Sequence, residues 1–249
     1  ACDDDTIMIV GSAPNFPHGI IDPIEALSDA AVQKGLWLHV DACVGGYFAP
    51  FARMNGVPVP AFDFELPGVH SMSADLHKYG YAAKGASTVL FRSEALFAHM
   101  PFDMNQWSGA PMKTPTLAGT RPGGAISAAW AVMNHLGIEG YKRLQGEVCA
   151  TRERVKEGVK RLGFEVLGNP MLGLLAFRHP DHHAFAIYGE IYRRGWFTSV
   201  TKDPPSLHLM LSPKHADFID EYLADLEASV NAVAASEDAE KLKVDARYS

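Results

Sequence analysis

Two ionisable residues, Asp41 and Lys78, follow apolar segments that are typical of buried strands. Asp41 ends the segment 36–41, and Lys78 lies in a polar turn between the strand candidates 69–73 and 87–92. Open α/β sheets bind their ligands at the carboxyl ends of the strands. The two residues are 37 positions apart (78 − 41 = 37), which leaves room for a helix and a strand. We therefore expect both side chains to reach one crevice.

A lysine amine and a carboxylate in one crevice suit pyridoxal 5'-phosphate (PLP), a cofactor with an aldehyde and a pyridine ring. The amine forms a Schiff base with the aldehyde. The carboxylate favours the protonated pyridine nitrogen because opposite charges attract, and the protonated ring withdraws electrons from the substrate. In a site of this kind Lys78 would be the Schiff-base lysine and Asp41 the partner of the ring nitrogen, an assignment that gains weight only from the motifs around the pair. Taken singly, each residue has a commoner explanation, as a helix cap or a solvated turn residue.

The elements that must position this pair alternate between strands and helices. Segments 6–11 and 36–41 are strand candidates. The helix between them is predicted to have Asp22 as its N-cap, Pro23 as its first residue and Gly35 at its end. A strand, a helix and a strand joined by short connections form a βαβ unit, which implies a parallel sheet.

The second half of the chain predicts a long helix followed by a smaller, mixed domain. The helix begins at Gly123 and ends near Leu162, with a break near Gly137. After it we expect strands at 164–167, 172–178 and 207–211 and helices at 184–194 and 216–235. The expected fold is α/β, with a mostly parallel sheet and helices on both faces. Residues 1–145 would belong to a large cofactor-binding domain, and residues 146–249 would lead into a small C-terminal α+β domain.

Composition narrows the possible functions of the chain. Its 249 residues have a formal net charge of −7 and no run of basic residues, so we expect no nucleic-acid partner. The three cysteines form no paired pattern, which fits a reducing compartment and predicts a cytoplasmic location. The apolar run 125–133 is too short to cross a bilayer. The histidines show no ligand spacing, so we expect no metal.

Four motifs stand in order along the chain. They are Gly11–Gly19 (GSAPNFPHG), His39–Tyr47 (HVDACVGGY), Ser73–Gly85 (SADLHKYGYAAKG) and Ala118–Gly124 (AGTRPGG). The second motif resembles the group II PLP-dependent decarboxylases. The other three more narrowly resemble the sphingosine-1-phosphate lyases of the same family. The resemblance covers nearly the whole chain and implies a fold-type I PLP enzyme.

This resemblance implies further roles for individual residues. Ala42 would pack near the face of the cofactor ring, and His77 would touch the cofactor phosphate. Thr120 would reach the phosphate of the cofactor in the neighbouring subunit, which implies a homodimer with a shared active site. Lys84 matches a second lysine that faces the substrate's phosphate or assists proton transfer.

The activity that the resemblance implies is retro-aldol cleavage of a phosphorylated 2-amino-3-hydroxy sphingoid base to a long-chain aldehyde and phosphoethanolamine. One departure concerns Phe16, because some bacterial lyases have a tyrosine there. Lys84, His18 or another group would then take over any proton transfer by that hydroxyl. The alternative is an amino-acid decarboxylase that uses the same Lys78 and Asp41. A third possibility is a non-catalytic fragment that only folds or dimerises.

The chain lacks two features that the family has in its N-terminal half. We find no Gly/Ser/Thr turn at a helix N-terminus for the cofactor phosphate, a dianion that needs such backbone donors. We also find no aromatic residue that stacks on the cofactor ring. Family members are longer, so we expect this chain to be a C-terminal portion that needs an N-terminal portion. Membrane association through that portion stays compatible with the cytoplasmic assignment.

Overall fold

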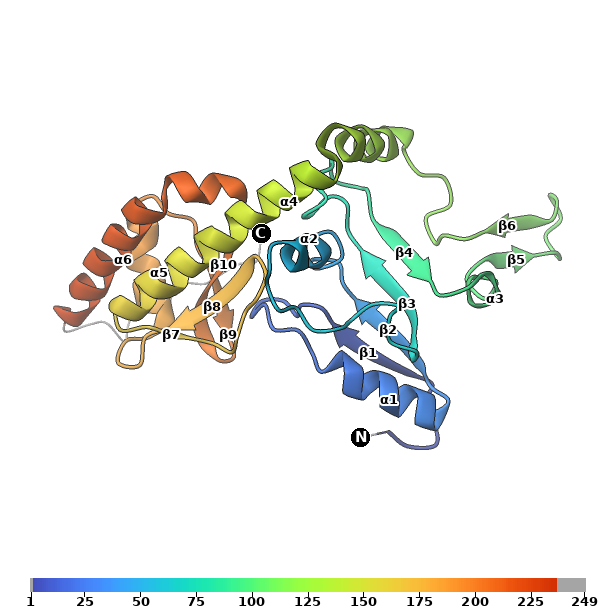
Figure 1. The fold of residues 1–249 in the computed structure, drawn as a ribbon, viewed down its shortest axis with the longest axis horizontal. Helices are drawn as coiled ribbons and strands as arrows, with labels where there is room; N and C mark the ends of the chain where they lie inside the picture. The colour runs from blue at the N-terminus through green and yellow to red at the C-terminus, as the bar shows by residue number, and fades with distance from the viewer. Residues whose placement is uncertain (1, 237–249) are drawn as a thin grey trace. The chain divides into compact units, whose positions relative to one another are not determined.

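The computed structural model describes residues 2–236, and its elements are shown in Figure 1. Contacts divide the chain into two compact units. The first comprises residues 1–13, 22–50 and 60–137, and the second comprises residues 14–21, 51–59 and 138–249. The predicted domain limits of 1–145 and 146–249 stay a prediction. Within the described residues, no helix combines the length and the apolar character needed to cross a bilayer.

The first unit is built on a four-stranded sheet in the order β1-β2-β3-β4. Its strands are β1 (Met8–Ser12), β2 (Trp37–Asp41), β3 (Val69–Ala74) and β4 (Thr88–Phe91). The pairs β1/β2 and β2/β3 are parallel, and β3/β4 is antiparallel. The predicted βαβ unit is confirmed, because helix α1 (Ile24–Lys34) connects the parallel strands β1 and β2. The carboxyl ends of β2 and β3 therefore lie at one edge of the sheet.

The ends of helix α1 show one prediction that holds and one that does not. Gly35 ends the helix in a left-handed conformation with φ 65°, as a C-terminal glycine allows. The start was predicted wrongly: the helix begins at Ile24, and Pro23 takes the cap position without a side-chain hydrogen bond. The Asp22 carboxylate instead accepts a hydrogen bond from the backbone N–H of Ser12, at 2.8 Å. It ties the loop to the end of β1 and is not the helix cap.

Four short elements were not predicted; three belong to the first unit, and α2 spans residues of both units. They are α2 (Ala49–Met54), α3 (Glu94–Phe97) and the antiparallel hairpin of β5 (Phe102–Met104) and β6 (Met112–Thr114). The hairpin precedes α4 (Gly123–Arg161), which is interrupted at Gly137 by backbone angles of φ 56° and ψ −173°. The predicted break near Gly137 is thereby confirmed.

The second unit contains an antiparallel sheet in the order β7-β8-β10-β9. Its strands are β7 (Glu165–Val166), β8 (Leu174–Arg178), β9 (Ser199–Lys202) and β10 (Pro205–Met210), accompanied by α5 (Ala184–Arg193), the 3-10 helix η1 (Pro213–Asp217) and α6 (Ile219–Ala234). Strand β8 is buried along four consecutive residues, which is typical of a strand covered on both faces. This mixture of sheet and helices confirms the small α+β part.

Candidate active site

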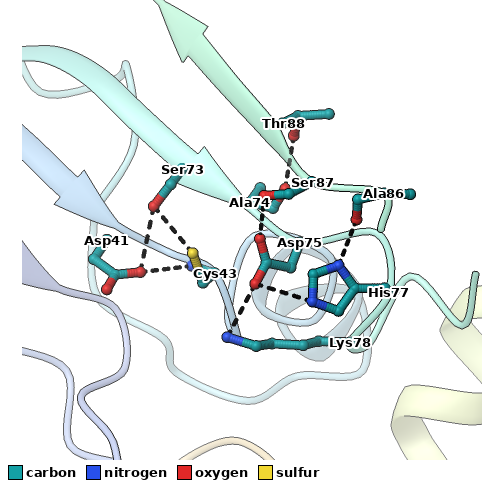
Figure 2. Close-up of polar contacts among 10 residues, drawn as sticks. All are labelled: Asp41, Cys43, Ser73, Ala74, Asp75, His77, Lys78, Ala86, Ser87 and Thr88. Atoms are coloured by element: carbon teal, nitrogen blue, oxygen red, sulfur yellow. Dashed lines mark hydrogen bonds and ion pairs between the residues drawn. The ribbon is translucent and has the colours of Figure 1, made fainter. Parts of the chain in front are cut away.

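Asp41 is the last residue of β2, and it lies opposite Ser73 of β3 in the parallel register. Its Oδ1 atom accepts a hydrogen bond from the backbone N–H of Cys43 at 3.0 Å and one from the Ser73 hydroxyl at 3.3 Å. Figure 2 shows both bonds reaching the same oxygen. Oδ2 takes no part in them. One oxygen thus fixes the carboxylate, and the other is left for a ligand.

Lys78 lies in a tight turn directly after β3. Its N–H donates to the Asp75 carbonyl at 3.2 Å, and its own carbonyl accepts from Tyr81 at 3.0 Å. Tyr81 has a left-handed φ of 57°, a conformation that costs a non-glycine residue roughly 1–2 kcal/mol. Strain of this kind is concentrated at functional sites. Gly80 is required by space, because a Cβ there would lie 2.5 Å from the Leu76 carbonyl oxygen.

The Lys78 amine is held by Asp75, a residue for which the motifs predicted no role. The distance from Lys78 Nζ to Asp75 Oδ2 is 3.0 Å, and the Ser87 hydroxyl donates to the other oxygen, Oδ1. Burial of Asp75 acts to raise the pKa of this carboxyl, but the hydrogen bond from Ser87 and the Lys78 ammonium outweigh it. The pKa therefore lies below its usual value, and Asp75 is a buried anion.

His77 turns its ring toward protein groups on both sides. Its Nδ1 atom lies 2.7 Å from the Ala86 carbonyl oxygen, and its Nε2 atom lies 3.6 Å from Asp75 Oδ2. A carbonyl can only accept, so Nδ1 is the donor in the first contact. Neutral His77 then has Nε2 as an acceptor, and only protonated His77 donates from both atoms. Its predicted contact with the cofactor phosphate stays a prediction.

Cys43 lies between the two carboxylates of the site. Its thiol donates to the Ser73 hydroxyl at 3.3 Å, and its carbonyl accepts from the backbone N–H of Asp75. Burial raises the pKa of the Cys43 thiol to about 11, and the nearby charges of Asp41 and Asp75 act in the same direction. Cys43 is therefore a neutral hydrogen-bonding group at physiological pH and not a nucleophile.

The predicted site residues fall into two groups. One group lies at the carboxyl ends of β2 and β3: Asp41 ends β2 and the fully buried Ala42 follows it, while His77 and Lys78 follow β3. Lys84 and Thr120, by contrast, are exposed.

Lys84 lies in the connection before β4, and Thr120 lies in the connection between β6 and α4. Neither side chain makes a hydrogen bond or ion pair within residues 2–236, so their roles stay predictions. Ser73 and Asp75 were missed as contributors. The signals for them were a serine inside the strand motif and an Asp three residues before the lysine.

A comparison with protein families decides the classification. Residues 7–180 match the model described as the pyridoxal-dependent decarboxylase conserved domain. The chain belongs to the pyridoxal-dependent decarboxylase family. This family match and the fold confirm the predicted resemblance and the fold-type I α/β architecture.

The curated proteins that resemble this chain include enzymes with two different activities. The sphingosine-1-phosphate lyase of Arabidopsis thaliana is 42% identical over 93% of this chain and 43% of its own length. A probable L-tyrosine/L-aspartate decarboxylase of Methanothermobacter thermautotrophicus is 34% identical over 90% of this chain and 61% of its own length. The chain thus spans less than half the length of the plant lyase.

Two solved structures of PLP enzymes resemble this chain in fold. The sphingosine-1-phosphate lyase of Burkholderia pseudomallei superposes with a TM-score of 0.88 at 38% identity, covering 93% of this chain and 53% of that one. The glutamate decarboxylase of Lactobacillus brevis gives a TM-score of 0.79 at 19% identity, covering 95% of this chain and 57% of that one. The second likeness shows the fold alone.

Membership of this pyridoxal-dependent family identifies PLP as the cofactor. The residues fit that cofactor, because the site combines an amine on Lys78 with an oriented carboxylate on Asp41. Within the described part of the chain, no group of three or more His, Cys, Asp or Glu residues could hold a metal ion.

Proposed function

We propose that this chain forms the C-terminal part of a PLP-dependent carbon–carbon lyase. Its substrate would be a phosphorylated 2-amino-3-hydroxy sphingoid base, and its products would be a long-chain aldehyde and phosphoethanolamine. The observation that supports this substrate best is the 42% identity to a sphingosine-1-phosphate lyase over 93% of the chain. The lyase of known structure supports it as well, at 38% identity.

The side chains divide the work of this reaction between them. Bound PLP supplies an electron sink for the electron pair released when a bond at the substrate's α-carbon breaks. Asp41 holds a proton on the ring nitrogen, where its negative charge favours the charged form. Lys78 provides the amine that attaches the cofactor. Ser73 and the backbone of Cys43 keep the Asp41 carboxylate in one orientation.

The reaction also needs groups that handle the substrate. A base must take the proton of the substrate's 3-hydroxyl, and Lys84 is our candidate for this transfer or for binding the substrate's phosphate. The compact ammonium of a lysine suits a phosphate dianion as a point charge. Lys84 is exposed in this chain.

The assembly that we propose is a homodimer with a shared active site. Thr120 would reach the cofactor phosphate of the neighbouring subunit, and His77 would touch the phosphate of its own. Exposed apolar side chains surround Thr120 in the sequence, among them Leu117 and Trp130. Large exposed apolar residues are typical of interaction surfaces when they gather in one region. The remaining part of the site would come from an N-terminal portion of the protein.

The location that we propose is cytoplasmic. Cys2, Cys43 and Cys149 are all free thiols. Free cysteines fit a reducing compartment, where disulfides are rare.

A decarboxylase is the second candidate, supported by the archaeal relative at 34% identity. One assay separates the candidates: the full protein is incubated with a phosphorylated sphingoid base and, in parallel, with aromatic and acidic amino acids. Release of a long-chain aldehyde supports the lyase. Release of carbon dioxide without aldehyde would overturn the lyase in favour of the decarboxylase. If the protein releases neither aldehyde nor carbon dioxide and shows no absorbance from bound cofactor, it is non-catalytic.

A further inference from the structure

Asp75 has an environment that a simple turn residue does not need. It follows β3 directly and is only 6% exposed, yet its carboxylate faces the Lys78 amine at 3.0 Å. The Ser87 hydroxyl donates to Oδ1 while the amine contacts Oδ2. Figure 2 shows the carboxylate of Asp75 between these two groups, with His77 beside it. Both oxygens are thus engaged, and the carboxylate has one orientation.

The main chain fixes Asp75 as firmly as its side chain does. Its N–H donates to the Cys43 carbonyl at 3.2 Å, and its carbonyl accepts from the Lys78 N–H at 3.2 Å. The first bond connects Asp75 to the segment that follows Asp41. The second closes the turn that carries the lysine. The backbone of Asp75 is therefore held by the segment after β2 and by the turn that carries the lysine, while Ser87 binds one oxygen of its carboxylate independently of the lysine.

The ordinary explanation is an ion pair that stabilises the turn. Pairs between exposed side chains contribute only about 0–1 kcal/mol. A buried carboxylate is different, because removing it from water is costly unless a charge and hydrogen bonds compensate. The pair here joins a nearly buried anion to a half-buried lysine. Such an arrangement holds a long, flexible lysine in a defined place, which a solvated pair does not.

We propose that Asp75 is a positioning residue for Lys78, one that fixes the amine at the cofactor site and faces any positive charge on its nitrogen. This inference rests on the proposed role of Lys78 as the cofactor-binding lysine. The nitrogen is positive as a free ammonium. It must lose a proton to solvent before it bonds to an aldehyde carbon, whose oxygen leaves as water. The Asp75 carboxylate would also favour a proton on this nitrogen after the bond has formed, because opposite charges attract.

The test uses the full protein loaded with PLP and compares three variants. Asp75→Asn keeps the shape of the side chain and an acceptor for Ser87 but removes the charge. Ser87→Ala keeps the charge and removes the hydrogen bond that orients it. Asp103→Asn is the matched control, because Asp103 is an exposed carboxylate of the same unit. Thermal unfolding verifies that each variant is folded, and total bound PLP is measured after alkaline release.

The readout is the fraction of bound PLP that absorbs visible light. Cofactor that is covalently attached and protonated gives this absorption band. We expect the ratio of this band to the rest to fall roughly tenfold in Asp75→Asn, the change that about 1.4 kcal/mol makes in an equilibrium constant. Ser87→Ala should give a smaller fall, and Asp103→Asn should match the parent. A turn-stabilising role would lower the unfolding temperature but leave this ratio unchanged in the folded protein.

The outcomes separate this inference from the proposed function. A folded Asp75→Asn variant with the parent's ratio overturns the inference. If Asp75→Asn does not fold, Ser87→Ala decides, and the parent's ratio in that variant overturns the inference. A parent protein that never shows the visible band after PLP is added contradicts the proposed function itself, whatever the variants do.

Discussion

The Ser73 hydroxyl donates to Asp41 Oδ1 at 3.3 Å from the position directly opposite it in the parallel register of β2 and β3. The backbone N–H of Cys43 donates to the same oxygen at 3.0 Å. Neither bond involves Oδ2, the oxygen that we propose faces the cofactor ring. The orientation of the Asp41 carboxylate is therefore a consequence both of strand pairing, which places Ser73, and of the loop after β2, which places the N–H of Cys43.

The Asp41→Asn substitution should lower turnover far more than it lowers the amount of bound PLP. Asparagine preserves the size of the side chain but no longer favours a proton on the ring nitrogen. We expect kcat to fall because the activation free energy rises by about 2.7–4 kcal/mol, the range found when one electrostatic contact is deleted from an active site. Turnover and bound PLP are measured on the same preparation. Turnover close to the parent's would mean that another group protonates the ring.

The Cys43 thiol should resist alkylation. Its pKa of about 11 compares with 9.0 for an unperturbed thiol, so near neutral pH it forms roughly a hundredth as much thiolate, the reactive species. Iodoacetamide labelling followed by peptide mapping should show Cys43 reacting about a hundredfold more slowly than the same residue in the denatured protein. Equal rates in the two states would show that the site does not suppress the thiolate.

His208 should make the second unit sensitive to acid. It is buried, and neither ring nitrogen has a hydrogen-bond partner within the described residues. Burial, with a smaller contribution from His18, lowers the pKa of His208 from 6.5 to about 4. The unfolded chain therefore binds a proton more readily. The stability that comes from neutral His208 is present above pH 6.5 and is lost as the pH falls toward 4, by at most roughly 3 kcal/mol.

The variant that tests this is His208→Phe, which keeps an aromatic ring beside Phe16. Denaturant unfolding between pH 7 and pH 4 should show a weaker pH dependence than in the parent. Some dependence remains because burial also lowers the pKa of His39 and His179. His99→Phe, at an exposed site, should leave the dependence unchanged. Identical curves for His208→Phe and the parent would contradict the assignment.

Lys84 separates the lyase from the decarboxylase. It follows Lys78 by six residues (84 − 78 = 6) and is exposed. In the full protein, Lys84→Ala should keep the visible absorbance of bound PLP and lose cleavage of the phosphorylated substrate. The measurements are an absorbance spectrum and an aldehyde assay on the same sample. Cleavage at the parent's rate would remove Lys84 from the mechanism and weaken the preference for a lyase.

Much of the scaffold could be predicted because its signals are local. Apolar runs that end in Asp41 or precede Lys78 predicted β2 and β3, and glycines at positions 35 and 137 predicted a helix end and a helix break. The short elements α2, α3, β5 and β6 were missed because segments of three to six residues contain too few periods to recognise.

The partners of the site residues could not be predicted from local patterns. Ser73 contacts Asp41 only because β2 and β3 pair in one particular register. Asp22 was expected to cap a helix, but the approach of β1 gives its carboxylate a different donor. Asp75 is close to Lys78 in the sequence, yet its importance depends on burial and on Ser87. These relationships are tertiary and become visible only in the folded chain.

The covalent position of the cofactor tests the central claim most directly. The full protein is loaded with PLP, reduced with borohydride, digested and mapped by mass spectrometry. The geometry predicts the pyridoxyl group on Lys78, whose amine extends from the turn after β3 and is held by Asp75 at 3.0 Å. A pyridoxyl group on Lys84 instead, or on neither lysine, would contradict the assignment of Lys78 as the residue that binds the cofactor.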